Sequence, residues 1–236
     1  MKAGIFAAGR GSRLRSPGNP LKPLVRVRGR GLIEHVLHAM AGAAATEVVI
    51  IINEDSLAVR EQVAKSTWPF ALRWIVENTP TSMHSFLRLV ETLADDGDVG
   101  PFLISTVDTV TSGNVYAHFF AEAQSNDAAV TLALTAPGDD EKPLLVRLGS
   151  DRLRVLAMGE GAASSHATAG IYAVRPSILR EAEAARRDGV DALRVFLGRL
   201  LERGYPLAGI PIGQTIDVDR PADIETAEAF LRSGAL

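Results

Sequence analysis

Two spacings of hydrophobic residues alternate along this chain of 236 residues. Short runs of consecutive apolar residues are typical of strands that are buried on both faces of a sheet. Apolar residues three or four positions apart are typical of helices that cover a sheet. The runs lie at 2–8, 47–52, 71–76, 101–106 and 128–134, and the helical spacing lies at 31–43, 56–65, 82–95 and 113–125. The alternation predicts an α/β fold with a mostly parallel sheet.

The pattern changes after about residue 135. Apolar residues at 144–148 and 153–156 flank Gly149-Ser150-Asp151-Arg152, an arrangement that predicts a β-hairpin. The remaining expected elements are a strand at 168–174, helices at 176–187 and 190–203, a strand at 206–212, and a helix at 222–232 that follows Pro221. We therefore expect a single domain over residues 1–236, in which the halves at about 1–135 and about 136–236 differ in pattern.

Composition narrows the class of protein. Hydrophobic residues make up 47% of the chain, which is enough for a sizeable core, and the 25 basic and 28 acidic residues form no long run of one sign. This balance argues against nucleic-acid and anionic-membrane partners. The lack of cysteine excludes disulfides and thiolate metal sites. No stretch approaches the roughly 20 apolar residues of a membrane span, and Met1-Lys2-Ala3 leads directly into a strand without a cleavable signal pattern. We expect a cytoplasmic protein, and the sequence does not indicate its oligomeric state.

The first predicted strand leads into the segment with the clearest chemistry. Gly9-Arg10-Gly11-Ser12-Arg13-Leu14 follows it, and Lys22-Pro23-Leu24 comes after a further loop. Glycines let a backbone approach a phosphate closely and turn N–H groups toward it. Arg13 and Lys22 would add positive charge around the same anion. The segment predicts binding of a nucleoside triphosphate, although glycine spacing alone fits an ordinary turn with surface arginines equally well.

Two other glycine motifs do not fit this segment. The dinucleotide-binding fingerprint requires a third glycine where this chain has Leu14. The P-loop requires Gly-Lys-Ser/Thr, whereas Gly9 is followed by Arg10 and Gly11.

Four segments together resemble the nucleotidyltransferases that make nucleotide sugars. Residues 7–14 followed by Lys22-Pro23-Leu24 are similar to the signature of that family, and residues 102–108 resemble its strand that ends in a metal-binding aspartate. Residues 169–172 resemble its "aGiY" strand, and residues 217–223 resemble the late segment that supplies a second metal ligand. The resemblance implies a Rossmann-like three-layer sandwich around a mostly parallel mixed sheet. It also implies that the first half binds the nucleotide and the second half binds the acceptor.

The resemblance also implies roles for individual residues. Arg13 and Lys22 would be catalytic, Arg13 offsetting the charge of pyrophosphate and Lys22 stabilising the α-phosphate in the transition state. The nucleotide would be bound by Ala8, Gly9, Gly11, Ser12 and Ser82. Taken alone, Ser82 fits a helix N-cap equally well.

Aspartates are the expected ligands of a Mg²⁺ cofactor. Asp108 follows an apolar strand, where a carboxylate can bind Mg²⁺ together with phosphate oxygens and water. It could instead be a turn or capping residue. Asp217 and Asp219 compete for the role of second ligand, since residues two apart on a strand point the same way. Alignment with the family favours Asp217, and Asp223 is expected to stabilise the start of the last helix.

The resemblance implies a single displacement, in which a phosphorylated acceptor attacks a nucleoside triphosphate and pyrophosphate leaves. We expect a sugar 1-phosphate as the acceptor. The alternatives are a cytidylyltransferase for a non-sugar phosphate such as phosphocholine, and a non-catalytic nucleotide-binding regulatory protein. Two departures from the family concern the acceptor side. Residues 158–166 lack the lysine that many sugar-phosphate members carry there, and Val107-Asp108 replaces the usual Gly-Asp.

Overall fold

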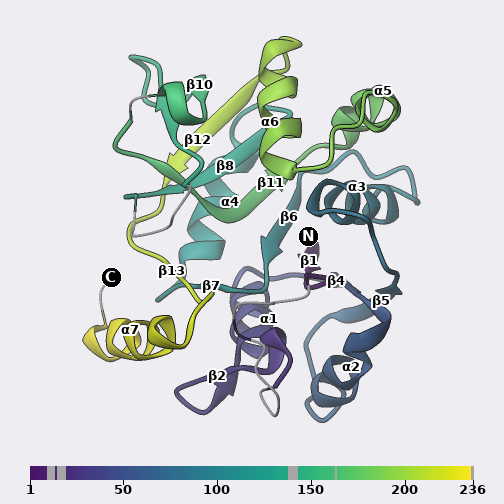
Figure 1. Cartoon of the computed structure of the whole chain (residues 1–236), viewed down its shortest axis with the longest axis vertical. Helices are drawn as coiled ribbons and strands as arrows, with labels where there is room; N and C mark the ends of the chain where they lie inside the picture. Colours follow the sequence, from purple (N-terminus) through teal and green to yellow (C-terminus); the bar gives the residue numbers. More distant parts are fainter. Residues whose placement is uncertain (10–13, 15–19, 138–142, 163, 235–236) are drawn as a thin grey trace.

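A seven-stranded sheet forms the centre of the computed structural model, which describes residues 1–9, 14, 20–137, 143–162 and 164–234 (Figure 1). In spatial order its strands are β12 (Leu207–Pro211), β8 (Val130–Thr135), β11 (Ala167–Val174), β6 (Phe102–Thr106), β1 (Lys2–Phe6), β4 (Glu47–Ile52) and β5 (Ala71–Val76). β11 is antiparallel to both of its neighbours, and the other pairings are parallel. The predicted mostly parallel mixed sheet is therefore confirmed.

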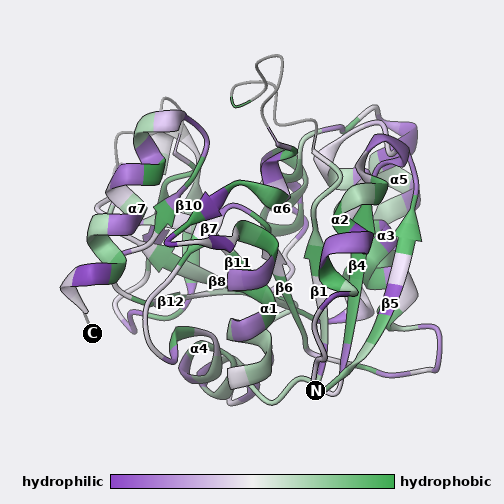
Figure 2. Cartoon of the chain, turned by 90° about the horizontal axis from the view of Figure 1, so that it is seen from below, coloured by the Kyte–Doolittle hydropathy of each residue, from purple (hydrophilic) through white to green (hydrophobic). Residues whose placement is uncertain are grey.

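Helices cover both faces of this sheet. One hydrophobic core lies under α1 (Leu32–Gly42), α2 (Leu57–Val63) and α4 (Val115–Gln124), and the other lies under α3 (Ser82–Leu93), α5 (Ala182–Arg187) and α6 (Leu193–Glu202). Strand β4 shows why the apolar run predicted a doubly buried strand. Val49 and Ile51 enter one core, while Ile50 and Ile52 enter the other. Figure 2 shows the central strands coloured mainly as hydrophobic, and the three-layer sandwich is confirmed.

A third, smaller core holds the C-terminal helix against the N-terminal half. Helix α7 (Pro221–Ser233) packs on β2 (Arg26–Val27) and on β13 (Ile216–Asp217) (Figure 1). β2 pairs with β3 (Arg30–Gly31), and β13 pairs with β7 (Thr109–Val110). Strands of two residues are too short to produce a periodic pattern, and the sequence did not predict them.

Most of the predicted elements form, with changes at their ends. The hairpin is present as β9 (Val146–Leu148) and β10 (Val155–Met158). The prediction of one helix over 176–187 was wrong in its first half, where a 3-10 helix (Pro176–Glu181) precedes α5. Pro176 lacks a backbone N–H, and Ile178 donates instead to the carbonyl three residues earlier. Shorter 3-10 turns lie at Lys22–Leu24, Glu54–Ser56 and Glu160–Ala162.

The ends of three adjacent parallel strands position the functional site. β1, β4 and β6 end at Phe6, Ile52 and Thr106, and parallel pairing brings these ends to the same edge of the sheet. In α/β proteins, ligands bind outside this carboxyl edge. Among the described residues, no helix has the length and apolar character needed to cross a bilayer.

Candidate active site

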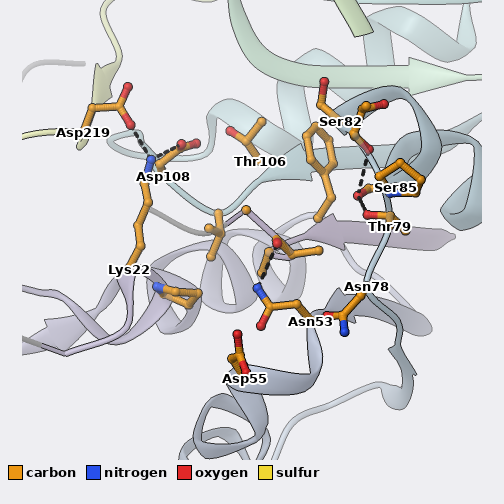
Figure 3. A pocket seen from close by; sticks show the side chains of 18 residues that line it. Lys22, Asn53, Asp55, Asn78, Thr79, Ser82, Ser85, Thr106, Asp108 and Asp219 are labelled. Carbon is orange, nitrogen blue, oxygen red and sulfur yellow. Dashed lines mark hydrogen bonds and ion pairs between the residues drawn. The ribbon is translucent and has the colours of Figure 1, made fainter. Parts of the chain in front are cut away.

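A cavity of about 950 Å³ lies at this carboxyl edge (Figure 3). Its walls come from the end of β1, the turn that holds Lys22, the end of β4, the segment between β5 and α3, and the end of β6. Figure 3 shows Lys22, Asp108 and Asp219 together at one end, uncharged polar side chains near Ser85 at the other, and Asp55 near Asn53. The two ends are therefore suited to different parts of a ligand.

The charged end is organised around one ammonium group. Lys22 Nζ donates hydrogen bonds to Asp108 Oδ2 at 2.6 Å and to Asp219 Oδ1. Lys22 lies in a 3-10 turn, Asp108 lies two residues beyond β6, and Asp219 lies two residues beyond β13. The Lys22 side chain is only 11% exposed, so its ammonium group is largely shielded from water, whereas the Asp219 side chain is 39% exposed. The structure thus brings together three of the residues predicted from the sequence.

The ion pairs determine the charge of both groups. Burial alone would lower the pKa of the Lys22 ammonium, but the two aspartates outweigh burial and raise that pKa. Burial would likewise raise the pKa of Asp108, but Lys22 and, to a smaller extent, the Thr106 hydroxyl lower it. Lys22 is therefore held positive and Asp108 negative at neutral pH.

Asp217 lies beside this cluster but has a different partner. Thr109 Oγ1 donates to Asp217 Oδ1 at 2.8 Å, across the pairing of β7 with β13. Asp217 and Asp219 flank the buried Val218, as the expected alternation predicts, yet only Asp219 contacts Lys22. Burial of the carboxyl group and the charge of Asp108 raise the pKa of Asp217 to about 7. Because the residue as a whole remains exposed, water moderates this shift.

The arrangement of carboxylates fits a Mg²⁺ ion whose remaining coordination positions would be filled by substrate phosphates. Asp108 and Asp219 already share one cation, the Lys22 ammonium. Mg²⁺ is commonly held by one or two carboxylates together with phosphates and water. Across the described residues, no three His, Cys, Asp or Glu side chains converge as an all-protein metal site. Asp108 is positioned to be one ligand, and the choice between Asp217 and Asp219 for the second remains a prediction.

The uncharged end of the cavity is formed by one continuous segment. Thr79 Oγ1 and Ser85 Oγ lie 2.5 Å apart, and Ser85 Oγ also donates to the Thr81 carbonyl at 3.4 Å. Ser82 lines the cavity, but its Oγ accepts a hydrogen bond from the backbone N–H of Leu193 at 3.1 Å. The alternative role of Ser82 as an N-cap is wrong, because the helix begins at Ser82 and Thr81 occupies the cap position. Its role in nucleotide binding stays a prediction.

The structure describes only part of the glycine-rich segment. Ala8 and Gly9 line the cavity, whereas Arg10, Gly11, Ser12 and Arg13 lie outside the described residues. The roles predicted for Gly11, Ser12 and Arg13 therefore stay predictions. At Gly9, an added Cβ would meet nothing within 4 Å among the described residues. Those residues do not require glycine here, and its role in letting a ligand approach closely stays a prediction.

Sequence reasoning missed Asn53. This residue follows β4, is 6% exposed, and donates from Nδ2 to the Ala8 carbonyl at 2.9 Å (Figure 3). It joins the end of β4 to the start of the glycine-rich segment. A polar residue directly after a doubly buried strand was the available signal, since such positions lie at the ligand-binding edge.

The capping role predicted for Asp223 is confirmed. Its Oδ2 accepts backbone N–H groups from Asp219 at 2.9 Å and from Arg220 at 2.6 Å. This cap fixes the start of α7 and, with it, the backbone of Asp219. Of the described residues that line the cavity, only Asp219 belongs to the half at 136–236, so the acceptor-binding role of that half stays a prediction.

The family model that matches most of the chain defines its class, the NTP transferase domains. More particularly, the chain belongs to the family of the MobA-like NTP transferase domain, whose model matches residues 3–199.

Two relatives and one solved structure illustrate the similarity. The bifunctional protein GlmU of Desulfotalea psychrophila is 35% identical over 136 residues, which cover 57% of this chain and 38% of the relative. The CMP-5'-(3-aminopropyl)phosphonate synthase of Streptomyces rubellomurinus is 29% identical over 211 residues, covering 87% of this chain and 32% of the relative. The chain thus spans about a third of the length of these relatives. The inositol-1-phosphate CTP transferase of T. maritima superposes with a TM-score of 0.77 at 17% identity, covering 100% of this chain and 97% of that one.

Proposed function

We propose that this protein transfers a nucleotidyl group from a nucleoside triphosphate to a sugar 1-phosphate, in a Mg²⁺-dependent reaction that releases pyrophosphate. The proposal rests chiefly on the cluster in which Lys22 lies between Asp108 and Asp219 at the charged end of the cavity. A fixed ammonium between carboxylates suits a reaction in which phosphate groups carry most of the charge.

In the proposed reaction, an oxygen of the acceptor phosphate attacks the α-phosphorus of the triphosphate. The bond from the α-phosphorus to the oxygen that bridges to the β-phosphate breaks, and pyrophosphate leaves with the electron pair. No covalent intermediate with the protein is needed, so the protein contributes position and charge. Lys22, held positive, stabilises the negative charge that develops on the α-phosphate oxygens.

Asp108 and one of Asp217 and Asp219 would hold Mg²⁺, which when bound neutralises charge on the phosphates of both substrates. The triphosphate would enter with its phosphates toward Ala8, Gly9 and the charged end. Its base would then lie toward Asn78 and Ser85, where uncharged donors and acceptors are available.

A second candidate is a cytidylyltransferase that acts on a non-sugar phosphate or phosphonate. The observation that favours it is the similarity to the CMP-5'-(3-aminopropyl)phosphonate synthase, which extends over 87% of this chain. The missing lysine in residues 158–166 is consistent with this candidate, because it concerns the acceptor side.

A screen for pyrophosphate release tests both candidates. The common nucleoside triphosphates would be combined with a panel of sugar 1-phosphates, phosphocholine and an aminoalkyl phosphonate, each with Mg²⁺. Release with a sugar 1-phosphate supports the first candidate, and release only from CTP with a non-sugar acceptor supports the second. Nucleotide binding without release from any pair would support the non-catalytic alternative.

A further inference from the structure

Two hydroxyl groups, one half-buried and one buried, connect the aspartates of the site. Thr106, the last residue of β6, lines the cavity, and its Oγ1 lies 2.9 Å from Thr109 Oγ1. Thr109 is only 3% exposed, and its Oγ1 donates to Asp217 Oδ1 at 2.8 Å. Either hydroxyl can donate in the bond between Thr106 and Thr109, and Thr109 in turn bonds to Asp217. A chain of two hydroxyl groups therefore links Asp217 to Thr106, which lies two residues before Asp108.

The backbone fixes the same three residues. Thr109 lies opposite Asp217 in the antiparallel pair of β7 and β13, and the Val218 N–H donates to the Asp108 carbonyl at 3.0 Å. Thr106 and Thr109 lie on either side of Asp108 in the chain. The segment that carries Asp217 is thus held against the segment that carries Asp108 by backbone and side-chain bonds together.

Gly170 leaves room for the two hydroxyl groups. It lies in β11 with a φ of +69°, where the pairing register with β8 shifts. A Cβ at this position would lie 2.6 Å from Thr106 Oγ1 and 2.7 Å from Thr109 Oγ1. Both distances are too short for real contacts, so any larger residue here would displace the hydroxyl pair. The glycine of the "aGiY" segment therefore has a structural reason in this chain.

We propose that Thr106 and Thr109 are positioning residues that set the Asp217 carboxylate relative to Asp108, so that the two aspartates can bind one divalent cation. This inference rests on the proposed function, and it identifies Asp217 as the second ligand. Asp219 is paired with the charged Lys22 ammonium, whereas the partner of Asp217 Oδ1 is the neutral Thr109 hydroxyl, so a cation at Asp217 would not have to displace a charged partner. Residues that donate hydrogen bonds to a metal-binding carboxylate commonly fix its orientation, and losing these bonds costs about 10–100-fold in metal affinity.

The test measures binding of Mn²⁺ alone to the full chain, by electron paramagnetic resonance or calorimetry. Thr109→Val removes the hydroxyl and keeps the shape, and it should weaken Mn²⁺ binding at least about tenfold. Thr109→Ser restores the hydroxyl and should bind within about twofold of wild type. Thr131→Val is the matched control, because Thr131 is 2% exposed, lies in β8, and bonds to Asn126 away from the site.

Gly170→Ala is a second, independent variant that keeps both hydroxyls but removes their space, and it should also weaken Mn²⁺ binding. If Thr109→Val does not fold, Mn²⁺ binding by Gly170→Ala tests the positioning role instead. Mn²⁺ binding by either folded variant within about twofold of wild type, or no Mn²⁺ binding by wild type, would overturn the inference. The pyrophosphate screen is a separate readout. If Mn²⁺ binding by the wild-type protein depends on the Thr109 hydroxyl but no pyrophosphate is released, the proposed function is contradicted and the positioning role stands.

Discussion

At one end of the cavity, Lys22, Asp108 and Asp219 come from segments up to 197 positions apart in the chain, and they meet through ion pairs. At the other end, Thr79, Ser82 and Ser85 belong to one short segment, carry no charge, and bond to each other or to nearby backbone groups. Figure 3 shows both ends in one view. The residues of the first end are brought together by the whole fold, whereas those of the second lie in the segment that leads from β5 into α3, which α6 anchors through the bond from Leu193 to Ser82.

This difference indicates that the two ends of the cavity have different functions in the proposed reaction. Charges that are held close together and away from water act strongly on phosphate groups. Neutral hydroxyl and amide groups add only modest binding energy, but they can distinguish one base from another. Substitutions at the charged end should therefore lower turnover, and substitutions at the uncharged end should change mainly the affinity for the nucleotide.

The largest effect is expected for Lys22→Ala. Removing a preorganised charge from a developing oxyanion typically costs about 2.7–4 kcal/mol, so kcat should fall at least about 100-fold. Steady-state kinetics with a thermal melt would measure this change. Lys2→Ala is the matched control, because Lys2 also pairs with two aspartates but lies at the opposite end of β1. Near-normal turnover in folded Lys22→Ala would exclude Lys22 from the mechanism.

Asp108→Asn should raise the Mg²⁺ concentration needed for half-maximal activity at least about tenfold. The amide keeps the shape of the side chain but loses the charge that a hard cation prefers. The measurement is a Mg²⁺ titration of activity, with Asp151→Asn in the distant hairpin as the control. A variant that melts far lower while its residual activity keeps the wild-type Mg²⁺ dependence would show that Asp108 is structural.

Gly9→Ala tests close approach of the ligand without a change of charge. The new methyl group meets nothing among the described residues, so the free energy of unfolding should stay the same or rise slightly, by about 0.4–1 kcal/mol. The KM for the triphosphate should rise about tenfold, because the methyl group would occupy space next to the phosphates. Gly198→Ala, which also adds a methyl group in open space, serves as the control. An unchanged KM would place the phosphates elsewhere.

Ser85→Ala should have the smallest effect, at the uncharged end. Loss of one neutral hydrogen-bonding group costs about 0.5–1.5 kcal/mol, which predicts a rise of about 2–10-fold in the KM for the triphosphate. The kcat should stay within about twofold. Thr92→Ala lies on the same helix, is similarly buried and bonds to the Arg88 carbonyl, so it controls for loss of a helix hydroxyl. A fall in kcat as large as that of Lys22→Ala would contradict the proposal that the two ends of the cavity have different functions.

Much of the fold could be predicted because its strands are long and doubly buried. The run Glu47–Ile52 and the helical spacing within 31–43 each specify an element without help from the rest of the chain. The two-residue strands β7 and β13 could not be predicted, because their pairing depends on where distant segments meet. That pairing is what places Asp217 and Asp219 beside Asp108.

The candidate site shows the same limit. Resemblance to a family pointed to Lys22 and Asp108, but no pattern in the sequence indicated that Asp219, rather than Asp217, contacts Lys22. Asn53 was missed because a lone asparagine carries no spacing signal, and its contact with Ala8 forms only when β4 lies beside β1. Contacts between distant segments are properties of the folded chain.

The central claim is that the protein transfers a nucleotidyl group with the help of a divalent cation. The most direct measurement follows pyrophosphate release and acceptor consumption together in the wild-type protein, first with Mg²⁺, then with a chelator, and then with Mg²⁺ restored. The account predicts one pyrophosphate for each acceptor consumed with Mg²⁺, almost none with the chelator, and recovery on restoration. Tight nucleotide binding that does not need the metal, without pyrophosphate release across the acceptor panel, would contradict it.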